Sequence, residues 1–144
     1  MVGVFAALVA CSDSSGTYPT GTYFTSPGLD VVQAHGLFVL TRKLVPSGTM
    51  DALFEGTVVV DDTGCIRLSG ADDATVIWPY GFTAALTIEG VEVHDGSGNP
   101  VGRLGDQFYL SGGDVETLPA ALGFTEEDRD LARRHCPGRY WIVS

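Results

Sequence analysis

Basic residues are few in this chain, and they form no cluster larger than a pair. The sequence holds 18 acidic against 8 basic residues, a net charge of −10 at pH 7, and Lys43 is its only lysine. A protein that binds nucleic acid needs a basic patch to contact the phosphates, so this composition argues against nucleic acid as a partner. An anionic membrane surface would also repel the chain unless a covalent group held it there.

Signatures of common catalytic and metal sites are missing as well. The chain has no G-x-S-x-G motif for a nucleophilic serine. Its three histidines share no spacing typical of zinc ligands; they are His35, His94 and His135. We therefore predict no catalytic residue, no bound metal and no other cofactor.

An uncharged apolar run opens the chain and ends at a cysteine. The first eleven residues read MVGVFAALVAC, and the polar sequence SDSSGTYPTGT follows them. The run is too short to span a bilayer, which takes about 20 apolar residues. Residues 8–11, Leu-Val-Ala-Cys, resemble the lipobox of bacterial lipoproteins. The resemblance implies that residues 1–10 are a signal segment that is removed. It further implies that Cys11 becomes the first residue, carries diacylglycerol on its sulfur, and anchors the protein to the extracytoplasmic face of the cell membrane.

The start of this run differs from an ordinary signal peptide, which begins with a segment that bears lysine or arginine. Here the apolar residues follow directly after Met1, so we expect the translated start to lie upstream. The other interpretation of the same residues is a first β-strand with a buried Cys11.

Two cysteines remain if Cys11 carries lipid. An even pair in an exported chain predicts a disulfide between Cys65 and Cys136. This bridge would close a loop of roughly 70 residues and stabilise the fold by roughly 4 kcal/mol in the chain-entropy model. In a cytosolic chain both thiols would instead be unpaired, and a nucleophilic cysteine beside His94 or His135 would then be a candidate catalytic pair.

Residues 56–113 predict an all-β fold. Short runs rich in valine, isoleucine, threonine and aromatic residues alternate there with clusters of glycine, aspartate, serine and asparagine, which is typical of short strands joined by turns. We predict a mainly antiparallel meander that closes into a small barrel or sandwich. The predicted strands of the domain are 37–44, 57–60, 65–68, 75–78, 82–88, 91–94, 101–104, 107–110 and 139–143.

A single helix is predicted near the C-terminus. Thr125 is a suitable N-cap, acidic residues 126–128 fill the first turn, and basic residues 133–135 fill the last, which is the charge order that the helix dipole favours. The predicted organisation is a signal segment at 1–10, a lipidated tether at 11–30 and one β-rich domain at 31–144.

One aromatic cluster is a candidate binding patch. Trp78, Tyr80 and Phe82 alternate with Pro79 and Gly81, and they either pack in the core or bind a small ligand or a partner. The expected function is that of a membrane-anchored, non-enzymatic interaction domain that contacts an envelope protein or another envelope component. Alternatives are a barrel that binds a small ligand or metal and, with less support, an exported hydrolase or thiol enzyme.

Overall fold

The computed structural model describes residues 21–43 and 50–144, so Cys11 and the predicted signal segment lie outside the described residues. Within these residues the chain forms eleven strands, a short 3-10 helix at Ala120–Leu122 and one α-helix, α1 (Glu126–His135). The strands are β1 (Thr22–Thr25), β2 (Leu29–Ala34), β3 (Leu37–Arg42), β4 (Ala52–Val60), β5 (Ile66–Leu68), β6 (Thr75–Trp78), β7 (Thr83–Thr87), β8 (Gly90–His94), β9 (Pro100–Arg103), β10 (Gln107–Val115) and β11 (Tyr140–Val143). The predicted all-β fold with one C-terminal helix is confirmed.

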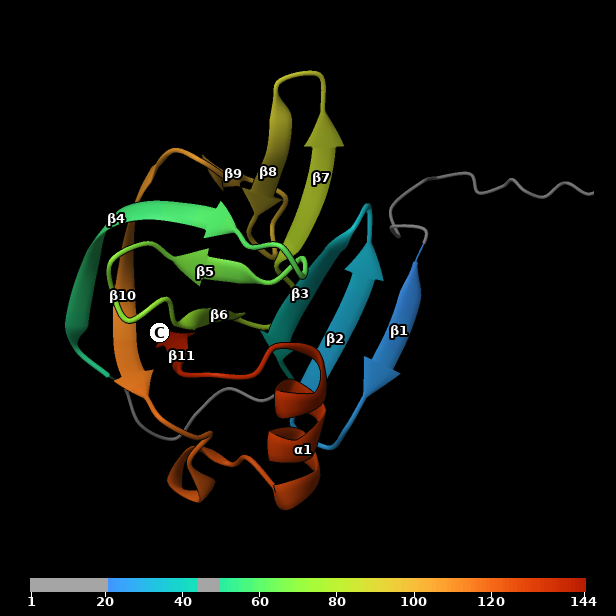
Figure 1. Ribbon diagram of the computed structural model, residues 1–144, viewed down its shortest axis with the longest axis vertical. Coiled ribbons are helices and arrows are strands. Elements are labelled where there is room, and N and C mark those ends of the chain that lie inside the picture. The colour runs from blue at the N-terminus through green and yellow to red at the C-terminus, as the bar shows by residue number, and fades with distance from the viewer. Residues whose placement is uncertain (1–20, 44–49) are drawn as a thin grey trace, which may run out of the picture.

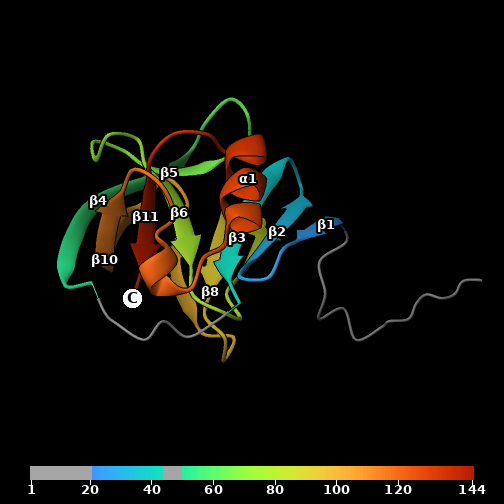
Figure 2. The ribbon, with the colours of Figure 1, turned by 90° about the horizontal axis from the view of Figure 1, so that it is seen from below.

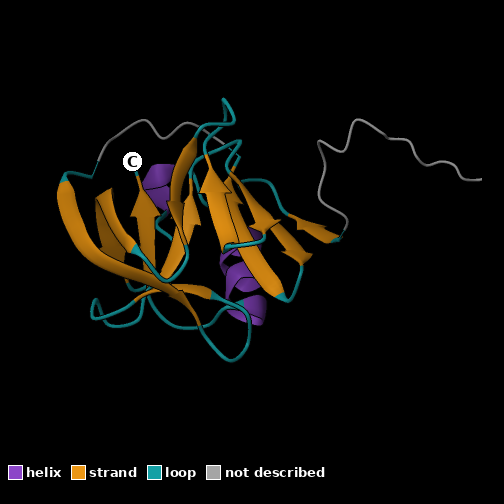
Figure 3. Ribbon diagram, turned by 90° about the horizontal axis from the view of Figure 1, so that it is seen from above, coloured by secondary structure: helices purple, strands orange, loops and turns teal. Residues whose placement is uncertain are grey.

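Five of the strands close into a barrel (Figure 1). They follow one another in the order β6-β11-β10-β4-β5, and β5 returns to β6 through the pairing of Arg67 with Thr75. All neighbours are antiparallel except β6 and β11, which run parallel. Alternate side chains of these strands point inward and fill the barrel with a packed core, which includes Val58, Ile66, Leu68, Val76, Trp78, Phe108, Leu110 and Trp141. Seen from above, the strands curve around this core and both helices lie at the far side (Figure 3).

Strands β3, β2 and β1 extend the sheet away from the barrel. Strand β3 pairs in parallel with the C-terminal half of β6, and β2 and β1 follow it in antiparallel order. Because successive side chains of a strand point to opposite faces, this extension has two apolar faces. Leu29 and Val31 of β2 point to one face and pack in the same cluster as Leu131 and Ala132 of α1. Figure 2 shows the helix beside these strands.

Strands β7, β8 and β9 form a separate antiparallel sheet. The β7–β8 hairpin projects from the body of the molecule (Figure 1). At the base of the hairpin, Val93 is buried in the same core cluster as the side chains that fill the barrel. Phe82 and Ala84 pack against this cluster. The hairpin therefore has an anchored base and a free end.

Helix α1 begins as the sequence predicts. The Thr125 hydroxyl accepts a hydrogen bond from the backbone of Asp128, and the Asp128 carboxylate accepts one from the backbone of Thr125, which completes a capping box. Gly123 precedes the helix with φ of 94°, a conformation that glycine adopts without strain.

Several predicted features differ from the structure. Residues 56–113 do not form one continuous meander, because β10 pairs with β4 and the β7–β8–β9 sheet is separate. Strand β1 lies within the segment 11–30 that we assigned to the tether. Strand β10 continues through Gly112 and Gly113, where we expected the strand pattern to end. A Cβ at Gly112 would lie 2.1 Å from the carbonyl oxygen of Ile142, so this glycine permits close strand packing rather than a turn.

Candidate functional site

The two predicted disulfide cysteines lie at bonding distance. Cys65 precedes β5 and Cys136 follows α1, their sulfurs are 2.11 Å apart and their Cα atoms 5.8 Å apart. Both residues are fully buried. The predicted bridge is confirmed, and it joins the helix and β11 to the β4–β5 hairpin. Sulfur atoms joined in this way are not thiolate nucleophiles, so the geometry gives no support to a catalytic cysteine–histidine pair.

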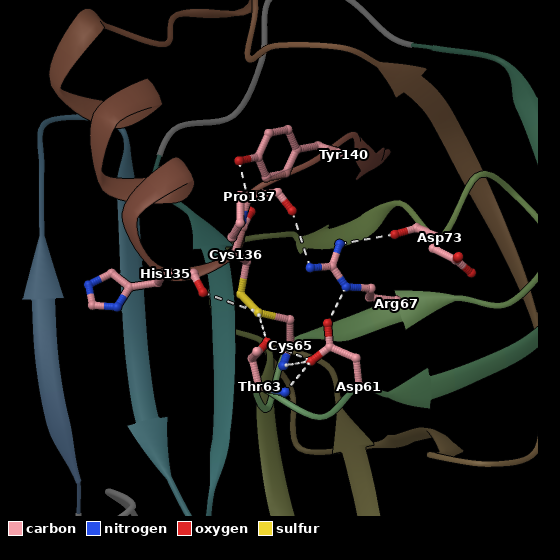
Figure 4. The surroundings of a disulfide bond; sticks show 9 residues. All are labelled: Asp61, Thr63, Cys65, Arg67, Asp73, His135, Cys136, Pro137 and Tyr140. Atoms are coloured by element: carbon pink, nitrogen blue, oxygen red, sulfur yellow. Dashed lines mark hydrogen bonds and ion pairs between the residues drawn. A yellow bond between two sulfur atoms is a disulfide. The ribbon is translucent and has the colours of Figure 1, made fainter.

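A polar network surrounds the disulfide (Figure 4). The Asp61 carboxylate accepts hydrogen bonds from the Thr63 hydroxyl, the backbone of Cys65 and the Arg67 guanidinium. Arg67 also donates to the carbonyl oxygens of Asp73 and Pro137. Burial alone would raise the pKa of Asp61, but the hydrogen bonds from Arg67, Thr63 and Cys65 outweigh it and hold this pKa well below its usual range. These contacts fix the turn beside the bridge and engage both Asp61 and Arg67 in holding the fold.

The ring of His135 lies close to this network but does not take part in it, although the His135 carbonyl oxygen lies 3.3 Å from the Cys65 sulfur. Its ring packs against Phe24 at 4.4 Å and Phe38 at 5.2 Å between ring centroids, and it points away from the disulfide (Figure 4). Burial, assisted by the charge of Arg134, lowers the pKa of His135. The ring is therefore a neutral packing element at pH 7.

The structure does not bring Trp78, Tyr80 and Phe82 together as a surface patch. Trp78 is fully buried in the barrel. Phe82 stacks on it with ring centroids 5.9 Å apart, and Tyr80 is 69% exposed. The predicted patch is thus mostly core, because the strand alternation places Trp78 inward at the end of β6.

An apolar groove lies instead between the β2–β3 and β7–β8 hairpins. Its walls are the second face of the sheet extension and the facing side of the β7–β8 hairpin, and it is lined mainly by Val32, Ala34, Leu37, Val39, Ala84, Leu86 and Val91. His35, Thr41 and Thr83 are its polar lining residues. The groove holds about 50 Å³ of free space, where one water molecule needs about 10–15 Å³. An aliphatic side chain or part of an acyl chain fits a space of this size and polarity.

The apolar surface continues from the groove to the tip of the β7–β8 hairpin. Leu86 pairs across the hairpin with Val91, and it is 60% exposed. Ile88, in the turn, is fully exposed. The sequence contains a pattern that indicates this surface, because every second residue from 82 to 88 is apolar: Phe82, Ala84, Leu86 and Ile88. The alternation predicts the strand and its apolar face, but only the tertiary structure shows that this face extends beyond the core.

Acidic and histidine side chains do not converge elsewhere in the described chain. Residues 21–43 and 50–144 contain no group of three or more histidine, cysteine or acidic side chains that could hold a metal ion. His94 contacts Glu92 at 2.7 Å within one strand. Among the same residues, no helix has the length and apolar content that crossing a membrane requires.

In comparisons with known proteins, no family model, no curated protein and no solved structure matches the chain. The function must therefore be inferred from the geometry of the groove and the hairpin tip.

Proposed function

We propose that the protein is a non-enzymatic interaction domain that binds an apolar group of an envelope component. A lipid on Cys11 would hold this domain at the extracytoplasmic face of the cell membrane. The observation that carries the proposal is the apolar groove between the two hairpins, together with its exposed continuation at Leu86 and Ile88. Exposed contiguous apolar surface of this kind is typical of interaction sites.

The disulfide supports an extracytoplasmic location. Bonds such as Cys65–Cys136 form and persist mainly outside the reducing cytoplasm.

The length of the segment between Cys11 and the described domain is also consistent with an anchor. Gly21 lies ten positions after Cys11, and ten residues of extended chain span at most about 33–36 Å. A lipid on Cys11 would thus keep the domain close to the membrane surface.

The groove is a better candidate site than the barrel interior. Trp78, Phe108 and Trp141 fill the barrel with their side chains, so we do not extend the proposal to a ligand or metal inside it. The groove instead has apolar walls on both sides and few polar groups to orient a ligand. This composition suits an aliphatic group better than a charged metabolite.

The anchor is tested by detergent phase partitioning in an exporting bacterium. We expect the parent protein to enter the detergent-rich phase and the Cys11→Ser variant to stay in the aqueous phase, because only the parent has a sulfur that can be acylated. Trypsin added to cells with a permeabilised outer layer should reach the domain, which reports the extracytoplasmic side. If both proteins partition alike, Cys11 is not the anchor and the proposal fails.

A further inference from the structure

We propose that the tip of the β7–β8 hairpin is a second membrane contact, in which Leu86 and Ile88 enter the interface of the bilayer to which Cys11 is anchored. This inference rests on the proposed function, since it assumes that the domain works beside a membrane. It adds an orientation: the groove would open toward the phospholipids, and the groove's occupant would be a phospholipid acyl chain.

The position of the chain's N-terminal end favours this orientation. Gly21 immediately precedes Thr22, which pairs with Gln33 at the end of β2, and a Cβ at Gly21 would lie 3.0 Å from that of Ala34. Ala34 lines the groove. The N-terminal end of β1, the β2–β3 turn and the β7–β8 tip lie toward the same end of the molecule (Figure 1). A tether that reaches Cys11 from Gly21 therefore starts beside the groove.

The distribution of charge favours the same end. The chain as a whole carries −10, which disfavours contact with an anionic lipid surface. At the hairpin, however, Glu89 lies 3.4 Å from Arg103, and Glu92 contacts His94. The acidic first turn of α1 lies at the opposite end of the molecule (Figure 1). At the hairpin end, the exposed Leu86 and Ile88 therefore lie near carboxylates that have partners.

Two apolar side chains bind a bilayer weakly by themselves, so the contact depends on the tether. A covalent anchor raises the effective concentration of the tip at the surface and makes the second contact intramolecular. The contact would orient an anchored domain rather than recruit a free one. A test must therefore hold the protein on the vesicle.

The test couples the full chain through the Cys11 thiol to a maleimide phospholipid in phosphatidylcholine vesicles. Cys65 and Cys136 are joined to each other, so Cys11 is the reactive thiol. A tryptophan is introduced by Ile88→Trp, and the matched control is Leu53→Trp. Leu53 lies on β4 and is 67% exposed, so both substitutions add an exposed tryptophan to the surface. The native Trp78 and Trp141 are buried and give an unquenched background.

With brominated phosphatidylcholine, we expect roughly half or more of the emission added by Ile88→Trp to be quenched, and almost none of that added by Leu53→Trp. Equal quenching of the two variants, or none, would overturn the orientation. If quenching is absent and Ile88→Ser converts a dimer to a monomer in sedimentation, the tip binds a second copy and the proposal is wrong. Because the coupling is chemical, failure here does not bear on the native anchor. Failure of the Cys11→Ser experiment would instead overturn the proposed anchored function, whatever the coupled protein does on the vesicles.

Discussion

The buried carboxylate of Asp128 allows a specific prediction for the free energy of unfolding. Its carboxylate is fully buried at the start of α1. It accepts hydrogen bonds from the Ser26 hydroxyl, from the backbone of Gly28 at 2.9 Å, and from the backbone of Thr125 at 2.7 Å. Residues about 100 positions apart in the sequence are thus joined by one side chain, and the β1–β2 turn is fixed to the helix.

The Asp128→Asn substitution keeps the shape and removes the charge. The amide oxygen can still accept from Ser26 and Gly28, but the amide nitrogen then faces the Thr125 N–H as a second donor. Losing one charged hydrogen bond at about 1.5–3 kcal/mol and weakening the two others lowers the free energy of unfolding by about 3 kcal/mol. The loss of a negative charge at a helix N-terminus acts in the same direction.

The effect depends on pH with a defined sign. Burial would raise the pKa of Asp128, but hydrogen bonds from Ser26, Thr125 and Gly28 outweigh it, so the net pKa is lowered. The unfolded chain, with a pKa of about 4, therefore takes up the proton first as pH falls. The stabilisation is complete above pH of about 5 and is lost as pH falls through the lower folded pKa. The difference between parent and variant should shrink accordingly in acid.

Urea unfolding without reductant, followed by tryptophan fluorescence at pH 7 and pH 3, measures this difference. The matched control is Asp130→Asn in the same helix, where the carboxylate is about half exposed and pairs with Arg133; its effect should stay within about 0.5 kcal/mol. If Asp128→Asn matches this control at pH 7, the buried carboxylate does not join the turn to the helix as described.

Two further predictions concern the frame of the domain. The Cys65→Ala/Cys136→Ala double variant should lose roughly 4 kcal/mol in urea unfolding, because the bridge closes a loop across a separation of 71 residues; an unchanged midpoint would contradict the bond. Gly64→Ala should lower the thermal midpoint clearly more than Gly98→Ala. Both glycines have positive φ, but only at Gly64 would a Cβ meet backbone, 2.3 Å from the carbonyl oxygen of Gly36, whereas nothing lies within 4 Å at Gly98. Strain alone costs about 1–2 kcal/mol, so equal effects would show that the close approach is absent.

Local features of the sequence were sufficient for most strands and for the helix. A tight turn at residues 61–64 joins β4 and β5, between the predicted strands 57–60 and 65–68, because aspartate and glycine suit tight turns. Thr125 caps α1 because a threonine oxygen satisfies a free helix N–H. Cysteine pairing was predictable from the even count that remains after Cys11. Each of these signals acts within a few residues or follows from composition.

Long-range pairing could not be predicted in the same way. Strand β10 pairs with β4, and β11 lies parallel to β6, and no residue in these strands specifies its partner. Strand β2 was not predicted, because its Leu29 and Val31 are buried by packing in one cluster with residues of α1, about 100 positions later in the sequence. For the same reason Trp78 was predicted as a candidate binding residue, although barrel closure buries it, and the exposed Ile88 was overlooked.

The intact mass of the protein purified from an exporting bacterium, alkylated without reductant, tests the central claim most directly. We expect a chain that begins at Cys11, is heavier by the mass of the lipid, and carries no alkyl group on Cys65 or Cys136. Such a result would establish the anchor and the disulfide together. A chain that retains residues 1–10, with alkylated thiols at Cys65 and Cys136, would contradict both the extracytoplasmic location and the lipid-anchored function.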